Sequence, residues 1–174
     1  MIIGSALIFI VLVAADLLTK ALICPEVRAA GGTMRFIPHI LRFEYTENTG
    51  MAWGLFKNGT LVLAVVSALC CVLIVFFIVK YRKRMPTLIR LALLMVLAGA
   101  FGNLVDRVFL GYVRDFLAFD FIEFPIFNFA DSCVTIGAML MGFGLVFTKK
   151  GRAFFASFDE KTTVKEQKTR ESDE

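Results

Sequence analysis

The sequence is poor in the side chains that most hydrolases and metalloenzymes use. It contains one histidine, His39, and four cysteines. Cys70 and Cys71 are adjacent and Cys133 lies in another apolar run, so none has the C-x₂-C spacing of a metal site. The segment FIPHILRF favours a strand or an interfacial element that leaves His39 at the surface. We therefore expect no metal, no cofactor and no Ser–His–Asp or Cys–His site.

Charge is also scarce, and long apolar runs take its place. Charged residues make up 20% of the chain and hydrophobic residues 58%, with a mean hydropathy of +0.75. Four runs reach the ~20 residues that a bilayer-spanning helix needs. They cover about residues 2–22, 59–79, 88–104 and 129–147. The first run lacks a basic n-region and carries Asp16, so we expect a spanning helix there and not a cleaved signal peptide.

Basic clusters beside the runs predict how the chain crosses the membrane. KYRKR (residues 80–84) follows the second run, and KKGR (149–152) follows the fourth. Cytoplasmic loops collect lysine and arginine, so both clusters and both termini are expected inside, with about residues 23–58 and 105–128 outside. These clusters also explain the net charge of +4 without a nucleic-acid partner.

The runs and their connections occupy nearly the whole chain. We therefore predict a single membrane domain over residues 1–150. Residues 151–174 form a charged segment that we expect to be a disordered cytoplasmic tail. The fold class predicted is all-α, with four transmembrane helices.

Polar side chains that hydropathy does not explain gather at one membrane depth. A charge at the centre of a spanning helix costs ~2.5–3.5 kcal/mol, so such residues persist with a partner or a task. Separately, Asp16 with Lys20 is explained as an i,i+4 ion pair, and Asp106 with Arg107 as an interfacial anchor. Their convergence near the outer face favours a site. The full set is Asp16, Lys20, Asn48, Asn103, Asp106, Arg107, Asp115, Asn128 and Asp131.

Carboxyl groups without histidine or metal suggest acid–base chemistry on water. Two close carboxyls do not both ionise cheaply, so one keeps a proton while the other accepts one, as in aspartic proteases. Asp16, Asp106, Asp115 and Asp131 are the candidates, and spacing does not choose among them. A small proton-coupled transporter or channel is the alternative function, and a non-enzymatic membrane scaffold is a third.

Five segments in order carry a resemblance to a known family. They are DLLTK (16–20), ENTGMAWG (47–54), AGAFGNLVDR (98–107), YVRDF (112–116) and FNFAD (127–131). Together they resemble the bacterial lipoprotein signal peptidases (signal peptidase II) over about residues 10–147. One departure is Ala98, where the family usually has glycine, although alanine also permits close helix packing.

The resemblance implies an intramembrane aspartic endopeptidase of the bacterial plasma membrane. It would remove the signal peptide from diacylglyceryl-modified prolipoproteins by cleaving before the lipidated cysteine. By motif, Asp115 and Asp131 would be the catalytic pair. The family also folds its first outer loop into a small β-rich cradle, which the segment MRFIPHILRFEYTEN suits. The residues expected to bind substrate or support the site are Asn48, Asn103, Arg107, Asn128, Asp106, Asp16 and Lys20.

Overall fold

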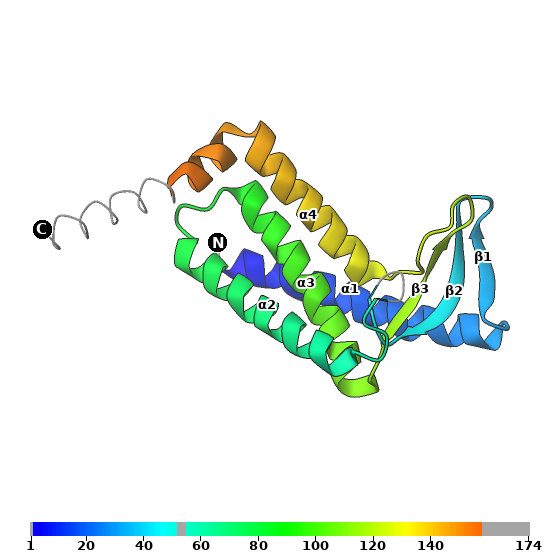
Figure 1. Ribbon diagram of the computed structural model, residues 1–174. Coiled ribbons are helices and arrows are strands. Elements are labelled where there is room, and N and C mark those ends of the chain that lie inside the picture. The colour runs from blue at the N-terminus through cyan, green and yellow to red at the C-terminus, as the bar shows by residue number, and fades with distance from the viewer. Residues whose placement is uncertain (1, 52–54, 158–174) are drawn as a thin grey trace, which may run out of the picture.

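The computed structural model describes residues 2–51 and 55–157, which form a bundle of helices with a small sheet at one end (Figure 1). In order, the elements are α1 (Ile2–Ala29), β1 (Thr33–Ile37), β2 (Leu41–Asn48), α2 (Thr60–Tyr81), α3 (Thr87–Leu110), β3 (Val113–Phe119) and α4 (Phe129–Phe147). These four helices are long and apolar enough to cross a membrane, as predicted. Large apolar side chains such as Leu61 and Leu73 remain 79% and 64% exposed, as expected for surfaces that face lipid.

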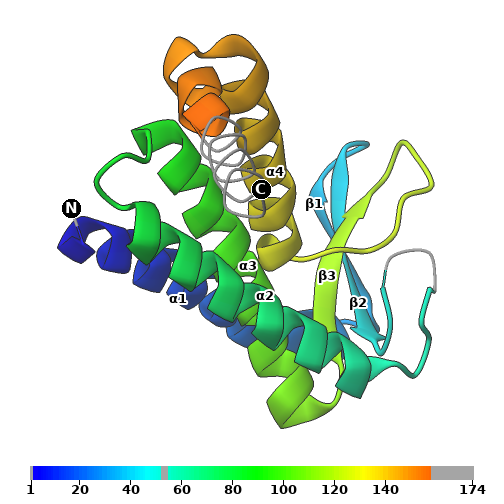
Figure 2. The same ribbon diagram turned by 60° about the vertical axis from the view of Figure 1, so that its left-hand side comes forward.

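Helix α3 lies at the centre of the bundle. The other three helices all pack against it, and two views show it between α2 and α4 (Figures 1 and 2). Glycines make the α3–α4 contact close. A Cβ on Gly99 would collide with the Ala130 carbonyl, and one on Gly137 would lie 2.8 Å from the Ala92 carbonyl oxygen. Small residues of this kind let spanning helices approach within backbone contact.

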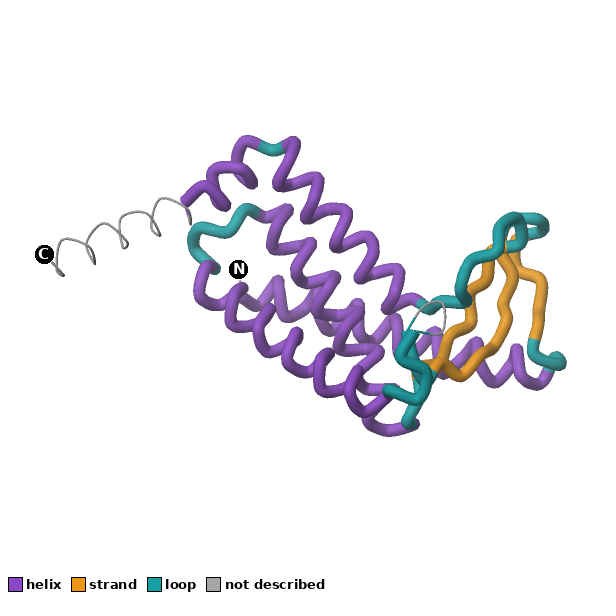
Figure 3. Tube along the Cα trace, viewed as in Figure 1, coloured by secondary structure: helices purple, strands orange, loops and turns teal. Residues whose placement is uncertain are grey.

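The sheet has three antiparallel strands in the order β1-β2-β3. Strands β1 and β2 form a hairpin from the first connecting segment, and His39 lies exposed near its turn with a φ of 62°. The prediction of a β-rich cradle in that segment is therefore confirmed but incomplete. Strand β3 comes from the connection between α3 and α4, and all three strands lie beside each other at one end of the bundle (Figure 3).

Helix α1 is longer than its apolar run and ends at Ala29, beyond the predicted end near residue 22. It continues through Pro25 because Cys24 and Val27, 3% and 0% exposed, are buried where α1 packs against the sheet. Cys24 is therefore a helical core residue and not part of an outer loop. The helix ends where Gly31 adopts a φ of 87° and the Gly32 amide donates to the Val27 carbonyl, 2.8 Å away.

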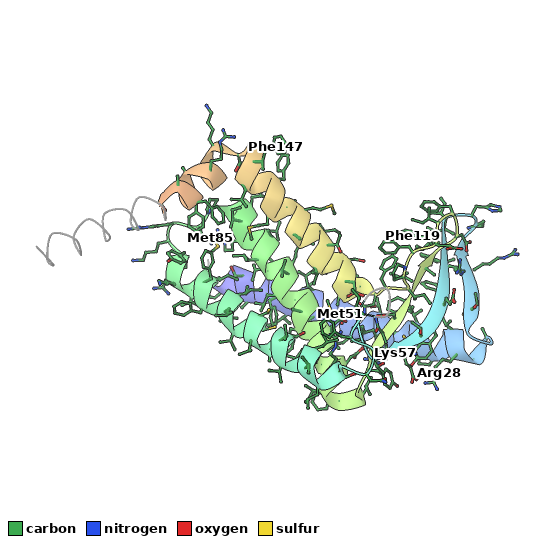
Figure 4. The ribbon with its side chains drawn as sticks, in the orientation of Figure 1. Arg28, Met51, Lys57, Met85, Phe119 and Phe147 are labelled. Atoms are coloured by element: carbon green, nitrogen blue, oxygen red, sulfur yellow. The ribbon has the colours of Figure 1, made fainter. Side chains whose placement is uncertain are left out.

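The end of the bundle away from the sheet holds a small apolar cluster. Phe154 packs against Met85 and Ile89, and Figure 4 labels Met85 at this end. Phe154 belongs to a helical segment over residues 149–157 that follows α4. Ordered packing thus continues past residue 150, while residues 158–174 of the predicted tail lie outside the described residues.

We expect Gly102→Ala to lower the free energy of unfolding by about 1–3 kcal/mol. Gly102 on α3 faces Asp16, and an added Cβ would collide with the Asp16 Oδ2 atom. Gly142→Ala on α4 is the matched control, because its Cβ meets nothing within 4 Å. The control is expected to be neutral or stabilising by up to about 1 kcal/mol. Unfolding in detergent measures both, and equal effects would contradict the close contact at Gly102.

Candidate active site

Asp115 and Asp131 are brought together from two different elements. Asp115 lies in β3 and is only 1% exposed, and Asp131 lies in the first turn of α4. Asn128 contacts both: its Nδ2 donates to Asp115 Oδ1 over 2.6 Å, and its backbone N donates to Asp131 Oδ2 over 3.1 Å. Asn48 Nδ2 donates to the other Asp115 oxygen over 2.9 Å. Three of the predicted supporting positions, Asn48, Asn103 and Asn128, thus touch the two carboxylates directly.

The start of α4 explains why Asn128 and Asp131 face each other. Asn128 is the N-cap residue, and its Oδ1 accepts a hydrogen bond from the Asp131 backbone N over 2.9 Å. The Asp131 side chain in turn accepts a hydrogen bond from the Asn128 backbone N, which completes a capping box. Backbone N–H groups at a helix N-terminus also favour negative charge, so Asp131 lies where a carboxylate is stabilised.

Asn103 links Asp131 to a buried lysine. Its Oδ1 accepts a hydrogen bond from Lys20 Nζ over 2.9 Å, and its Nδ2 donates to Asp131 Oδ1 over 2.8 Å. A lysine ammonium only donates, so it fixes which end of the amide turns toward it. Asn128 Nδ2 donates to the same Oδ1 over 3.1 Å, so Lys20 and Asn128 together orient the Asn103 side chain with its NH₂ group toward Asp131.

Lys20 is fully buried and neutralised by two carboxylates. Its Nζ lies 2.9 Å from Asp16 Oδ2 and 3.4 Å from Asp106 Oδ2. Asp16 also accepts a hydrogen bond from the Ala130 backbone N at the start of α4, over 2.9 Å. The predicted i,i+4 pair is present, but it is also a tertiary link between α1, α3 and α4.

Arg114 is a site-supporting residue that sequence reasoning missed. Its Nη2 and Nε donate to the two carboxylate oxygens of Asp106, over 2.7 and 3.3 Å, and its backbone N donates to Asp106 Oδ2 over 3.0 Å. These bonds hold the residue next to Asp115 against α3. The only sequence signal was an arginine directly before the aspartate in YVRDF.

Arg107 points from α3 toward the segment after β2. Its Nη2 donates to the Gly50 carbonyl over 3.2 Å. Its Nε is buried and has no hydrogen-bond partner within residues 2–51 and 55–157. The charges of Asp131 and Asp115 act on this guanidinium, so it supplies a positive group beside the two carboxylates.

Burial and, to a smaller extent, the nearby Asp131 charge raise the pKa of Asp115 from 3.8 to about 7. Hydrogen bonds from Asn48 and Asn128 act in the opposite sense but are outweighed. A carboxyl with a pKa near neutrality keeps its proton through much of the physiological range. The site therefore contains one carboxyl that can donate a hydrogen bond, close to a second carboxyl in the first turn of a helix.

A cavity of about 600 Å³ lies beside the two carboxylates, between the helix ends and the segment that precedes α4. Its polar lining includes Asn48, Asn103, Arg107, Asp115 and Asp131. An adjoining groove of about 940 Å³ runs over the sheet and shares Asp115 with this cavity. Figure 4 labels Met51, which lines both spaces, near the junction of helices and sheet. Of the other predicted residues, Asn128, Asp106, Asp16 and Lys20 lie behind the lining.

The arrangement suits hydrolysis by paired carboxyls. In the described part of the chain, no cluster of three or more His, Cys, Asp or Glu side chains is placed to hold a metal ion. The two carboxyls, three amides and one guanidinium supply proton transfer and hydrogen bonding to a peptide.

Comparison with known proteins identifies relatives over most of the chain. The signal peptidase (SPase) II family profile matches residues 8–147. The lipoprotein signal peptidase of Enterococcus faecalis is 38% identical, covering 83% of this chain and 88% of the relative. That of Symbiobacterium thermophilum is 38% identical, covering 86% and 99%. A bacterial membrane enzyme solved by the in meso method is 32% identical with a TM-score of 0.73, covering 84% and 89% of the two chains. The chain therefore belongs to the signal peptidase II family of aspartic endopeptidases.

Proposed function

We propose that Asp115 and Asp131 are the catalytic pair with which this multi-pass membrane peptidase processes prolipoproteins. The observation that carries the proposal is the Asn128 side chain and backbone bonded to both carboxylates at the wall of a cavity. Asp16 and Asp106 are engaged by cations instead, Lys20 and Arg114, and neither lines the cavity. We therefore assign Asp16 and Asp106 a supporting role in the site and not a catalytic one.

The mechanism follows from the different surroundings of the two carboxyls. Asp115, with its raised pKa, holds a proton and donates a hydrogen bond to the scissile carbonyl oxygen. Asp131, at the positive end of α4, carries the charge and takes a proton from the attacking water. The proton then passes to the leaving amine. The two groups titrate as one coupled dyad.

The remaining site residues hold the substrate or the dyad. Asn48 and Arg107 line the cavity on the side of the sheet and are placed to bind a peptide backbone. Asn103 and Asn128 position the carboxyls. Lys20, Asp16 and Asp106 act through them and are positioning residues.

We propose a diacylglyceryl-modified prolipoprotein as the substrate, cut before the lipidated cysteine. Two features support this. The cavity has many apolar lining side chains, which come from β3, from α4 and from the segment before α4. The groove over the sheet offers a path for the part of the substrate that follows the cysteine. The test is cleavage by the purified protein of a lipidated prolipoprotein beside the same chain without lipid. Equal cleavage of both would contradict lipid recognition, and no cleavage of either by folded protein would contradict the catalytic assignment.

The proposed orientation places the sheet and the dyad at the outer face and both termini in the cytoplasm. Lys80, Arg82, Lys83, Arg84 and Lys149 lie at or beyond helix ends far from the sheet, in keeping with the excess of basic residues in cytoplasmic loops. A membrane-impermeant thiol reagent should label Arg35→Cys in intact cells but not Lys150→Cys. The reverse pattern would overturn the orientation.

A transporter requires polar groups across the whole membrane. Among the described residues, the buried polar side chains lie together at the sheet end of the bundle. This arrangement supports the peptidase function over the proton-coupled alternative.

Activity and stability should both depend on the Asp115 proton. Cleavage is expected to fall as the pH rises above about 7.

The folded pKa of Asp115 exceeds the unfolded value of 3.8, so the stability contributed by protonated Asp115 is lost as the pH rises from about 4 through about 7. The unfolding midpoint of wild type minus that of Asp115→Asn, both measured at the same pH, should decline over that window. In Asp131→Asn the decline should move to lower pH, because the neighbouring charge is gone; an unchanged profile would contradict the assignment.

A further inference from the structure

A groove between α1 and α2 opens at the end of the bundle away from the aspartates. Both helices pack against α3 rather than against each other, which leaves a space of about 650 Å³ between them. Figure 4 labels Met85, which lies in the same turn between α2 and α3 that borders the groove. The lining residues are Ile3, Ser5, Ile78, Val79, Arg82, Lys83 and Arg90.

The groove has apolar walls and a basic end. Ile3 and Val79 are 85% and 60% exposed along its length. Arg82 and Lys83 lie exposed in the turn, and Arg90 lies half-buried on α3, donating to Thr87 Oγ1 over 3.3 Å. No ion pair joins these three side chains to an acid in the described part of the chain.

This end of the molecule also has no acidic residue nearby in sequence. Residues 2–15, 59–105 and 132–157 contain neither aspartate nor glutamate. Three positive charges therefore converge on one apolar groove without compensation from the described chain. A ligand with a negative head and a long apolar tail matches both features.

We propose that this groove binds an anionic phospholipid, with its phosphate against Arg82, Lys83 and Arg90 and an acyl chain along Ile3, Ile78 and Val79. Basic pockets between spanning helices recognise such headgroups by charge. Residues 158–174 are acidic in part, but Phe158 and Val164 are their only large apolar side chains, too few to fill the groove. In the orientation proposed above, the lipid belongs to the cytoplasmic leaflet. The site is separate from the dyad.

The test uses the full-length protein in mixed micelles with equal phosphatidylglycerol and phosphatidylcholine. Native mass spectrometry measures which lipid is retained, and thermal unfolding is followed with each lipid alone. The groove variant is Arg82→Gln, Lys83→Gln and Arg90→Gln together. The matched control removes the same charge from the same end but outside the groove: Arg84→Gln, Lys149→Gln and Lys150→Gln.

Wild type and the control are expected to retain phosphatidylglycerol over phosphatidylcholine by roughly tenfold or more, and the groove variant is expected to lose the preference. Equal loss in both triple variants would show general surface charge instead of a site and would overturn the proposal. So would a groove variant whose unfolding midpoint drops equally in both lipids, because the groove would then hold part of this chain. Displacement of the lipid by soluble glycerol phosphate would indicate a simple anion site and would also count against it.

Discussion

Asp115→Asn is expected to reduce prolipoprotein cleavage by at least about 10³-fold while the protein stays folded. Asparagine keeps the shape of the side chain and one acceptor oxygen for the amides of Asn48 and Asn128, which donate to both oxygens of Asp115, but it does not shuttle a proton. Burial disfavours the ionised form of Asp115 and raises its pKa to about 7. Asparagine carries no charge, so this cost is absent in the variant, and its stability at pH 8 should not fall below that of wild type. The measurement is the cleavage rate of a lipidated substrate together with the unfolding midpoint.

Two further variants make this result specific to the dyad. Asp131→Asn should give a similar loss, because either carboxyl alone lacks its partner. Glu26→Gln makes the same change from carboxylate to amide at an exposed position of α1 that lines neither the cavity nor the groove. Its cleavage rate is expected to stay within about threefold of wild type, as for most surface substitutions. Full activity in Asp115→Asn would redirect the assignment to Asp106 or Asp16.

Lys20→Met is expected to lower the free energy of unfolding by about 3–5 kcal/mol, because it leaves the buried Asp16 without its cation. Lys20 is 0% exposed and pairs with Asp16 and Asp106 over 2.9 and 3.4 Å. The same change removes one of the two hydrogen bonds to Asn103 Oδ1 and leaves only the one from Asn128 Nδ2, so Asn103 holds Asp131 less firmly and cleavage should also fall. Unfolding in detergent and the cleavage rate measure the two effects.

Lys150→Met removes an exposed lysine at the other end of the molecule and serves as the control, with an expected change within about 0.5 kcal/mol. A second variant separates charge from packing. Asp16→Asn combined with Lys20→Met should recover a large part of the lost stability. Asp106 keeps Arg114 in this variant, and the introduced asparagine keeps an acceptor oxygen for the Ala130 amide. No recovery would mean that the loss came from the lysine stem and not from its charge.

The sequence by itself determined the four spanning helices, and its motifs predicted the candidate site residues except Arg114. Apolar runs of spanning length predict four helices without knowledge of their contacts, because each run must satisfy its own backbone in lipid. The start of α4 at Phe129 is also local, since Asn128 and Asp131 form a capping box within one turn. The five motifs named both aspartates, although spacing alone did not choose them from four candidates.

Tertiary structure alone decided how these residues meet. Hydropathy predicts only an outer connection over about residues 105–128, because the partner strand of β3 is far away in sequence. The pairing of β3 with β2 spans about 70 residues, as Thr46 opposite Asp115 illustrates. Helix α1 extends beyond its apolar run because Cys24 and Val27 are buried against the sheet. The Lys20–Asn103–Asp131 chain joins three helices, and hydropathy gives only their depth. Which side chains touch across helices depends on rotation and packing, and these arise only when the whole bundle forms.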